Sequence, residues 1–153
     1  FFKCWTVERM AALIARLQAD GHPVLLTAAP SRTETEMVDA IQKLLPTPAA
    51  SLAGRLNLKE LAALTGRARL FVGVDSAPMH MAAAMGTPIV ALFGPSGDKQ
   101  WGPWGVPCRV VASRNHPCRP CGIDGCGGGK VSDCLLSLSP DEVYAAAQEL
   151  LAR

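Results

Sequence analysis

The sequence predicts an α/β fold, in which a parallel sheet carries helices on both faces. Helical and strand-like segments alternate along the 153 residues, with short connections between most of them. The main strand-like segments are apolar throughout, which is typical of strands covered on both faces, whereas the helical segments carry apolar residues on one face. Such alternation favours parallel strands joined by helical crossovers. Because this length can bury one good core, we expect a single domain over residues 1–153.

Four amphipathic helices are predicted from their caps and their apolar spacing. They begin at Thr6, at Ser31, at Asn57 and at the capping box that Ser139 forms with Glu142. The first is expected to end at residues 20–21. The residues expected to face inward are Met10, Leu13, Ile14 and Leu17, then Met37, Val38, Ile41, Leu44 and Leu45, then Leu58, Leu61, Ala62 and Leu64, and finally Val143, Ala147 and Leu150.

Five strands are expected between these helices. Residues 70–74 and 88–93 are wholly apolar and are predicted to be buried strands, and residues 108–112 form a third. A short apolar strand is expected at residues 23–27 and a weak edge strand at 49–53.

The most informative segment is the turn that follows the strand at residues 70–74. Asp75 and Ser76 end that strand, and Ser76 can cap a helix that begins at Ala77 with Pro78 in its first turn. A polar turn at the carboxyl end of a parallel strand, followed by the N-terminus of a helix, is a position at which α/β folds bind phosphate. The turn therefore predicts a phosphate site.

Composition argues against several classes of function. A formal net charge of +2 and an aromatic content of 5% do not favour a nucleic-acid-binding surface. No apolar stretch reaches the length of a transmembrane helix, and residues 1–5 do not read as a signal peptide. Five of the six cysteines are gathered at residues 108–134 instead of being spread along the chain, which favours a reducing compartment. We therefore expect a cytoplasmic protein.

Three segments together resemble the signature of the bacterial lipopolysaccharide heptosyltransferases, glycosyltransferase family nine. They are Gly-Val-Asp-Ser-Ala-Pro-Met-His at residues 73–80, Ala-Ala-Ala-Met-Gly-Thr-Pro at 82–88 and Ala-Leu-Phe-Gly-Pro-Ser at 91–96. Lys3 and Trp5, followed by an amphipathic helix, resemble the start of that family's donor-binding domain. The resemblance implies the C-terminal, Rossmann-like half of a GT-B glycosyltransferase.

The same resemblance implies a reaction and its partners. The enzyme would transfer heptose from ADP-heptose to the lipopolysaccharide inner core at the cytoplasmic face of the inner membrane, with peripheral membrane contact. A catalytic carboxylate and the acceptor site are expected on an N-terminal domain outside residues 1–153. No cofactor and no catalytic metal are expected, because helix amides, Lys3 and His80 can meet the phosphate charge.

The resemblance also assigns roles to individual residues, each of which has a plainer interpretation. Asp75, Ser76 and Ala77 would hold the pyrophosphate, although Asp75 and Ser76 can simply end a strand and cap a helix. His80 and Lys3 would stabilise the departing ADP as catalytic residues, although they can be a packing histidine and a solvated lysine.

A glutamate in the second helix is expected near the ribose of the donor. Glu34 is the first choice and Glu36 the alternative, although the capping position after Ser31 also explains Glu34.

Ala77 stands where many members have glycine, and its methyl group narrows the approach to the pyrophosphate. Met79 and Met85 are predicted to lie in the core rather than against the base.

Two further groups leave alternatives open. Cys118, Cys121, Cys126 and Cys134 resemble the family's cysteine loop and could bind zinc, remain reduced or form a disulfide. Trp101 and Trp104 either contact a sugar or a neighbouring domain, or cover the edge of the sheet. Two other functions also remain: a transferase that uses another nucleotide sugar, and a non-catalytic, zinc-stabilised binding module.

Overall fold

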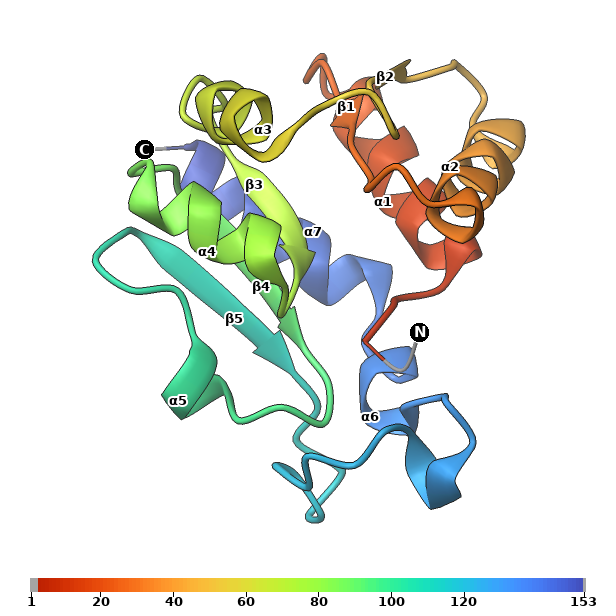
Figure 1. The fold of residues 1–153 in the computed structure, drawn as a ribbon, viewed down its shortest axis with the longest axis vertical. Helices are drawn as coiled ribbons and strands as arrows, with labels where there is room; N and C mark the ends of the chain where they lie inside the picture. Colours follow the sequence, from red (N-terminus) through yellow and green to blue (C-terminus); the bar gives the residue numbers. More distant parts are fainter. Residues whose placement is uncertain (1–2, 153) are drawn as a thin grey trace. The chain divides into compact units, whose positions relative to one another are not determined.

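The computed structural model describes residues 3–152 (Figure 1). Phe1 and Phe2 lie outside the described residues. They belong to residues 1–5, the segment that was not expected to be a signal peptide. The chain divides into two compact units, residues 6–61 and residues 1–5 together with 62–153. The single domain expected over residues 1–153 stays a prediction.

The unit of residues 6–61 is built on two helices and a short parallel strand pair. Helix α1 (Val7–Ala19) and helix α2 (Arg32–Leu44) pack together, and β1 (Leu25–Leu26) pairs with β2 (Ala50–Ser51). Both strands fall within the expected segments but are shorter than predicted. Their shared core consists of Ala11, Ile14, Ile41, Leu45 and Ala49.

All four predicted starts of the amphipathic helices, at Thr6, Ser31, Asn57 and Ser139, are confirmed in atomic detail. The Thr6 side chain accepts a hydrogen bond from the Arg9 amide at 3.2 Å, as an N-cap does. Helix α3 (Leu58–Thr65) begins with a capping box, in which Asn57 Oδ1 accepts from the Glu60 amide and Glu60 Oε2 from the Asn57 amide. Ser31 Oγ caps α2 by accepting from the Glu34 amide at 3.3 Å, and Ser139 forms a capping box with Glu142 at the start of the last helix.

Two leucines expected to face inward do not. Leu44 is 53% exposed and Leu58 is 70% exposed. Leu44 is the last residue of α2 and Leu58 the first of α3. At a helix end a side chain has neighbours on one side only, so periodicity overestimates its burial there.

The second unit contains a three-stranded parallel sheet in the order β3-β4-β5. Its strands are β3 (Phe71–Val74), β4 (Ile89–Phe93) and β5 (Cys108–Ala112). Every residue of the central strand β4 is buried, as predicted. Strand β3 is only half-buried, so the expectation that it is covered on both faces is wrong. The reason is its place at the edge of the sheet.

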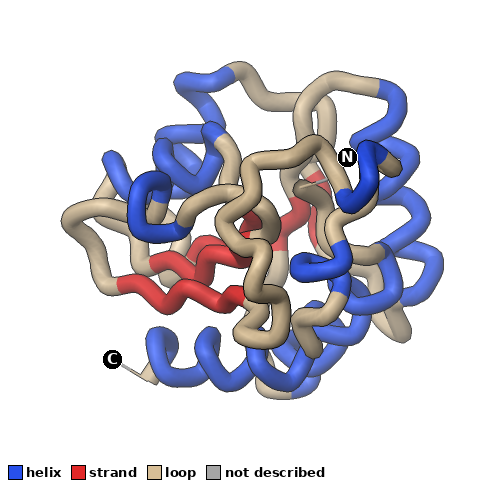
Figure 2. The backbone as a smooth tube through the Cα atoms, turned by 90° about the horizontal axis from the view of Figure 1, so that it is seen from below, coloured by secondary structure: helices blue, strands red, loops and turns tan. Residues whose placement is uncertain are grey.

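Helices cover both faces of this sheet, which confirms the predicted α/β class. Helix α4 (Ala77–Ala84) packs against β3 and β4, and helix α7 (Pro140–Leu151) packs against β4 and β5 from the other side (Figures 1 and 2). Met79 is fully buried, as expected. Met85 is 46% exposed, contrary to expectation, because it follows the last turn of α4.

Short elements complete the unit. They are α5 (Asp98–Trp101), the 3₁₀ turn η1 (Cys126–Gly128) and α6 (Asp133–Leu136). Among the described residues, no helix is both long and apolar enough to cross a bilayer.

The capping box at Ser139 is expected to support α7 measurably. Ser139 Oγ lies 3.2 Å from the Glu142 amide, and Glu142 Oε2 accepts from the Ser139 amide at 2.9 Å. Replacing Ser139 by Ala should lower the free energy of unfolding by about 1 kcal/mol, measured by urea denaturation. Ser137→Ala is the control, because its hydroxyl donates to the Cys134 carbonyl and satisfies no helix N–H. Equal losses in the two variants would contradict a capping role.

Candidate functional site

Asp75, which directly follows β3, is the centre of a polar cluster. Its side chain is 9% exposed, and its Oδ2 accepts a hydrogen bond from Lys3 Nζ at 2.7 Å. His80 Nε2 lies 3.8 Å from the other carboxylate oxygen, and the Ser96 side chain is close enough to lower the pKa of Asp75. We call Lys3, Asp75, His80 and Ser96 the Asp75 cluster. The structure thus brings together three of the predicted site residues.

The N-terminal segment that carries Lys3 is anchored to the second unit. Trp5 is 5% exposed, and its indole Nε1 donates to the Leu138 carbonyl at 3.2 Å. This anchor holds Lys3 beside the end of β3 although 72 residues separate Lys3 from Asp75 along the chain. Lys3 is therefore not the freely solvated lysine of the plainer interpretation.

The Asp75 carboxylate is stabilised in its charged form. Burial alone would raise the pKa of Asp75, but the hydrogen bonds from Lys3 and Ser96 and the charges of Lys3 and His80 lower it further than burial raises it. The net pKa lies below the ordinary value of 3.8. Asp75 is consequently an anion at neutral pH and orients the cation beside it.

Ser76 occupies the cap position of α4 but does not cap it with its side chain. Its hydroxyl donates to the Val74 carbonyl at 3.1 Å, and no side chain caps α4. The prediction that the Ser76 side chain caps this helix is therefore wrong. The side chain turns back toward the strand, and the Ser76 carbonyl accepts the Met79 amide at 3.1 Å. The amide of Ala77, the first helical residue, has no acceptor within its own helix and points out of its N-terminus.

This arrangement can bind an anion at the carboxyl edge of the sheet. The N-terminus of α4 supplies a partial positive charge, and Lys3 and His80 supply donors on either side of Asp75. His80 is exposed, with 45% of its side chain accessible, so it is not the buried packing histidine of the plainer interpretation. Both donors can reach a ligand in solvent while Asp75 keeps them in place.

The candidate ribose residues lie in the other unit. The Glu34 amide donates to Ser31 Oγ at 3.3 Å, as a cap requires, and Glu34 Oε2 accepts from the Ala29 amide. Glu36 pairs with Arg32 at 2.6 Å. Both contacts are internal to residues 6–61. A contact between either glutamate and a ribose stays a prediction.

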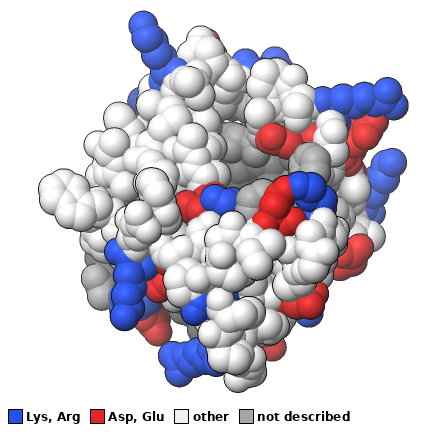
Figure 3. All heavy atoms as spheres, turned by 60° about the horizontal axis from the view of Figure 1, so that its bottom comes forward, with Lys and Arg blue, Asp and Glu red and all other residues white. Residues whose placement is uncertain are grey.

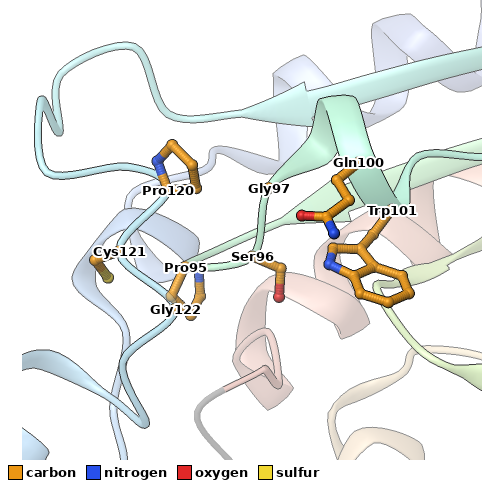
Figure 4. Close-up of a pocket in the computed structure, with 8 residues that line it drawn as sticks. All are labelled: Pro95, Ser96, Gly97, Gln100, Trp101, Pro120, Cys121 and Gly122. Atoms are coloured by element: carbon orange, nitrogen blue, oxygen red, sulfur yellow. The ribbon is translucent and has the colours of Figure 1, made fainter.

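A cavity of about 320 Å³ adjoins the Asp75 cluster at Ser96 (Figure 4). Residues 95–97, Gln100 and Trp101 line it on one side, and residues 120–122 on the other. Sequence reasoning assigned no separate role to Ser96 or Gln100. The available signal was their position directly after β4, at the same sheet edge as Asp75.

The two tryptophans after β4 are both exposed, Trp101 by 51% and Trp104 by 88%. They therefore do not cover the sheet edge as buried side chains would. Trp104 lines a second depression of about 320 Å³ together with His80, Ala83, Ala84 and Gly105.

All six cysteines are free thiols in the structure. Cys118, Cys121 and Cys126 are exposed, whereas burial raises the pKa of the Cys134 thiol. Within residues 3–152, no group of three or more His, Cys, Asp or Glu side chains is placed to hold a metal ion. Neither the zinc site nor the disulfide considered from the spacing is formed here.

Charged side chains of both signs are intermixed on the face drawn in Figure 3. A nucleic-acid surface requires lysine and arginine gathered on one face or stripe. The absence of a nucleic-acid partner stays a prediction.

Comparisons with known proteins agree with these features. The model of glycosyltransferase family 9 (heptosyltransferase) matches residues 1–131. The chain is 43% identical over 104 residues to lipopolysaccharide heptosyltransferase 3 of Escherichia coli, covering 67% of this chain and 31% of that protein. It is 32% identical over 156 residues to lipooligosaccharide heptosyltransferase 2 of Haemophilus influenzae, covering 99% of this chain and 44% of that protein.

Solved structures give the same result. A family 9 glycosyl transferase from Veillonella parvula superposes with a TM-score of 0.82 at 28% identity, covering 98% of this chain and 42% of that one. The Escherichia coli ADP-heptose lps heptosyltransferase II superposes with a TM-score of 0.81 at 26% identity, covering 99% of this chain and 43% of that one. The chain thus spans less than half the length of these relatives. It belongs to glycosyltransferase family 9, the heptosyltransferase family.

Proposed function

We propose that residues 1–153 are the donor-binding part of a glycosyltransferase that transfers heptose from ADP-heptose to the lipopolysaccharide inner core. Two curated relatives are named lipopolysaccharide or lipooligosaccharide heptosyltransferases, and a solved relative is named for ADP-heptose. The family membership supports the reaction class. The relatives' names support the sugar and the acceptor.

The Asp75 cluster is the observation that carries this proposal. It lies where β3 ends and α4 begins, and it combines two donors with the N-terminus of a helix. A pyrophosphate there would accept from the Ala77 amide, with the Ser76 backbone and Asp75 shaping the turn around it. This position suits the phosphates of a nucleotide sugar.

Lys3 and His80 are the proposed catalytic residues on this chain. Negative charge develops on ADP as the bond between the anomeric carbon and the phosphate oxygen breaks. Donors already held beside that oxygen stabilise the charge without reorganisation. Asp75 acts as a positioning residue, since it holds Lys3 at 2.7 Å and lies 3.8 Å from His80.

The remaining parts of the reaction belong to other groups. A carboxylate outside residues 1–153 would deprotonate the acceptor hydroxyl. Glu34, or alternatively Glu36, would contact the donor ribose. We expect the reaction at the cytoplasmic face of the inner membrane, where the protein would act in peripheral contact with the lipid that carries its acceptor.

Replacing His80 by Ala tests this proposal on the chain itself. Since His80 is exposed, the variant should unfold at the same temperature as the original protein. Its affinity for ADP, measured by calorimetry, should fall roughly tenfold, which corresponds to one lost hydrogen bond to a charged group.

His22→Ala is the matched control, because His22 is a histidine of the unit of residues 6–61 and does not belong to the Asp75 cluster. It should bind ADP like the original chain. An unfolding defect in His80→Ala with unchanged ADP affinity would contradict the proposed role. Tighter binding of UDP or GDP than of ADP would instead point to another nucleotide sugar.

A further inference from the structure

The cavity beside Ser96 has a lining suited to a neutral ligand. None of the side chains that line it is charged. Trp101 offers an indole that is 51% exposed, while Gln100 and Ser96 offer an amide and a hydroxyl. Figure 4 draws Gln100 and Trp101 on the last turn of α5, with Pro120, Cys121 and Gly122 on the opposite segment. An aromatic face beside hydrogen-bonding groups matches a polyhydroxylated ring better than it matches a phosphate.

The two walls of this cavity are fixed to one another. The Gly122 amide donates to the Pro95 carbonyl at 3.0 Å. Behind the wall, the Arg119 side chain is 10% exposed and donates to the Gly94 carbonyl at 2.6 Å and to Asp98 at 3.3 Å. Arg119 also donates to the Ser113 carbonyl at 3.2 Å. These bonds hold the cavity open before any ligand arrives, which lowers the entropic cost of binding.

Ser96 joins the cavity to the candidate phosphate site. It lines the cavity, and its side chain is also close enough to Asp75, the residue before the cap of α4, to lower the pKa of that carboxylate. In a nucleotide sugar the glycosyl ring is joined directly to the terminal phosphate. A phosphate at the Asp75 cluster would therefore place its sugar within reach of Ser96.

We propose that this cavity is a glycosyl subsite, in which Trp101 packs against a pyranose ring and Gln100 and Ser96 hydrogen-bond to its hydroxyls. The inference rests on the proposed function and adds the part of the ligand that this chain recognises beyond the phosphates. A volume of about 320 Å³ lies at the lower end of ligand pockets. It suits one sugar ring and not a whole nucleotide sugar.

The test compares ADP-heptose with ADP on the same chain by calorimetry. Trp101→Ala and Gln100→Ala should each weaken ADP-heptose binding about fivefold or more while leaving the ADP affinity within about twofold, because only the sugar contact is lost. Trp101→Phe keeps an aromatic face and should recover most of the affinity. Ile123→Ala is the control, because Ile123 is 54% exposed nearby and does not line the cavity.

A methyl heptopyranoside probe distinguishes the donor sugar from the acceptor sugar. If the cavity holds an acceptor sugar instead, Trp101→Ala should weaken the heptoside and leave ADP-heptose unchanged, and that result would overturn the assignment to the sugar of the donor. Unchanged binding of both sugar ligands in Trp101→Ala and Gln100→Ala, with ADP still bound, would overturn the subsite alone. Failure of the original chain to bind ADP would overturn the proposed function and the subsite together.

Discussion

Residues 1–153 alone are expected to transfer no heptose from ADP-heptose to a lipopolysaccharide core acceptor. The 104 matched residues cover only 31% of the Escherichia coli heptosyltransferase 3, and the proposed base and acceptor site lie outside residues 1–153. Holding two substrates in reactive geometry contributes on the order of 10⁵-fold or more, and one wall of a site cannot supply it. Transfer of radiolabelled heptose would measure this directly, with ADP binding by the same sample as the control for folding.

A chimera that supplies the missing part of the enzyme is expected to be active. Residues 1–153 joined to the part of the Escherichia coli heptosyltransferase 3 that they do not match should transfer heptose. Measurable transfer by residues 1–153 alone would contradict the account, because the base would then lie within this chain. Glu34 and Asp98 would be the carboxylates to replace, although Asp98 already accepts a hydrogen bond from Arg119.

The second large effect is expected from Lys3. Lys3→Met leaves the Asp75 carboxylate buried without its closest cation, and it removes the strongest positive charge of the cluster. The free energy of unfolding should fall by about 1 to 2 kcal/mol, below the range for fully buried pairs because the Lys3 side chain is 40% exposed. ADP binding should fall by roughly thirtyfold or more.

The double variant Lys3→Met with Asp75→Asn separates these two effects. Removing the unpaired charge should restore most of the stability, whereas ADP binding should stay weak because the cation is still missing. A double variant that regains full ADP affinity would contradict a direct role of Lys3 at the phosphates. The comparison also measures the coupling of the pair by a double-mutant cycle.

The same pair gives a pH dependence with a defined sign. The pKa of Asp75 is lower in the folded chain than its ordinary 3.8, so its contribution to stability is present above about 3.8 and is lost as the pH falls toward the lower folded value. Lys3→Met removes a hydrogen bond and a positive charge that lower this pKa, so the folded pKa of Asp75 rises. Its stability should therefore fall less steeply over this acidic range than that of the original chain.

The buried strands could be predicted because their residues are apolar throughout. Strand β5 has the expected bounds and β4 begins one residue later than expected. Strands β1 and β2 contain two residues each rather than five, since a strand extends only as far as its partner pairs with it. The local sequence of a strand does not show how far its partner strand will pair with it.

The site was predicted in its residue types more than in its contacts. The motif at residues 73–80 located Asp75 and His80, but the rotamer of Ser76, which turns toward Val74, is not written in the sequence. The cavity was missed for a different reason. Its walls, at residues 95–101 and 120–122, are brought together by Arg119 and by the bond from Gly122 to Pro95, both of which are tertiary contacts.

Competition for ADP tests most directly whether the turn after β3 binds pyrophosphate. Titration of the chain with ADP, AMP, adenosine and inorganic pyrophosphate separates the phosphates from the base. The account predicts that AMP binds at least about tenfold more weakly than ADP, and that pyrophosphate displaces ADP whereas adenosine does not. Equal affinities for ADP and AMP, with displacement by adenosine and none by pyrophosphate, would show that the phosphates are not held here and would contradict the account.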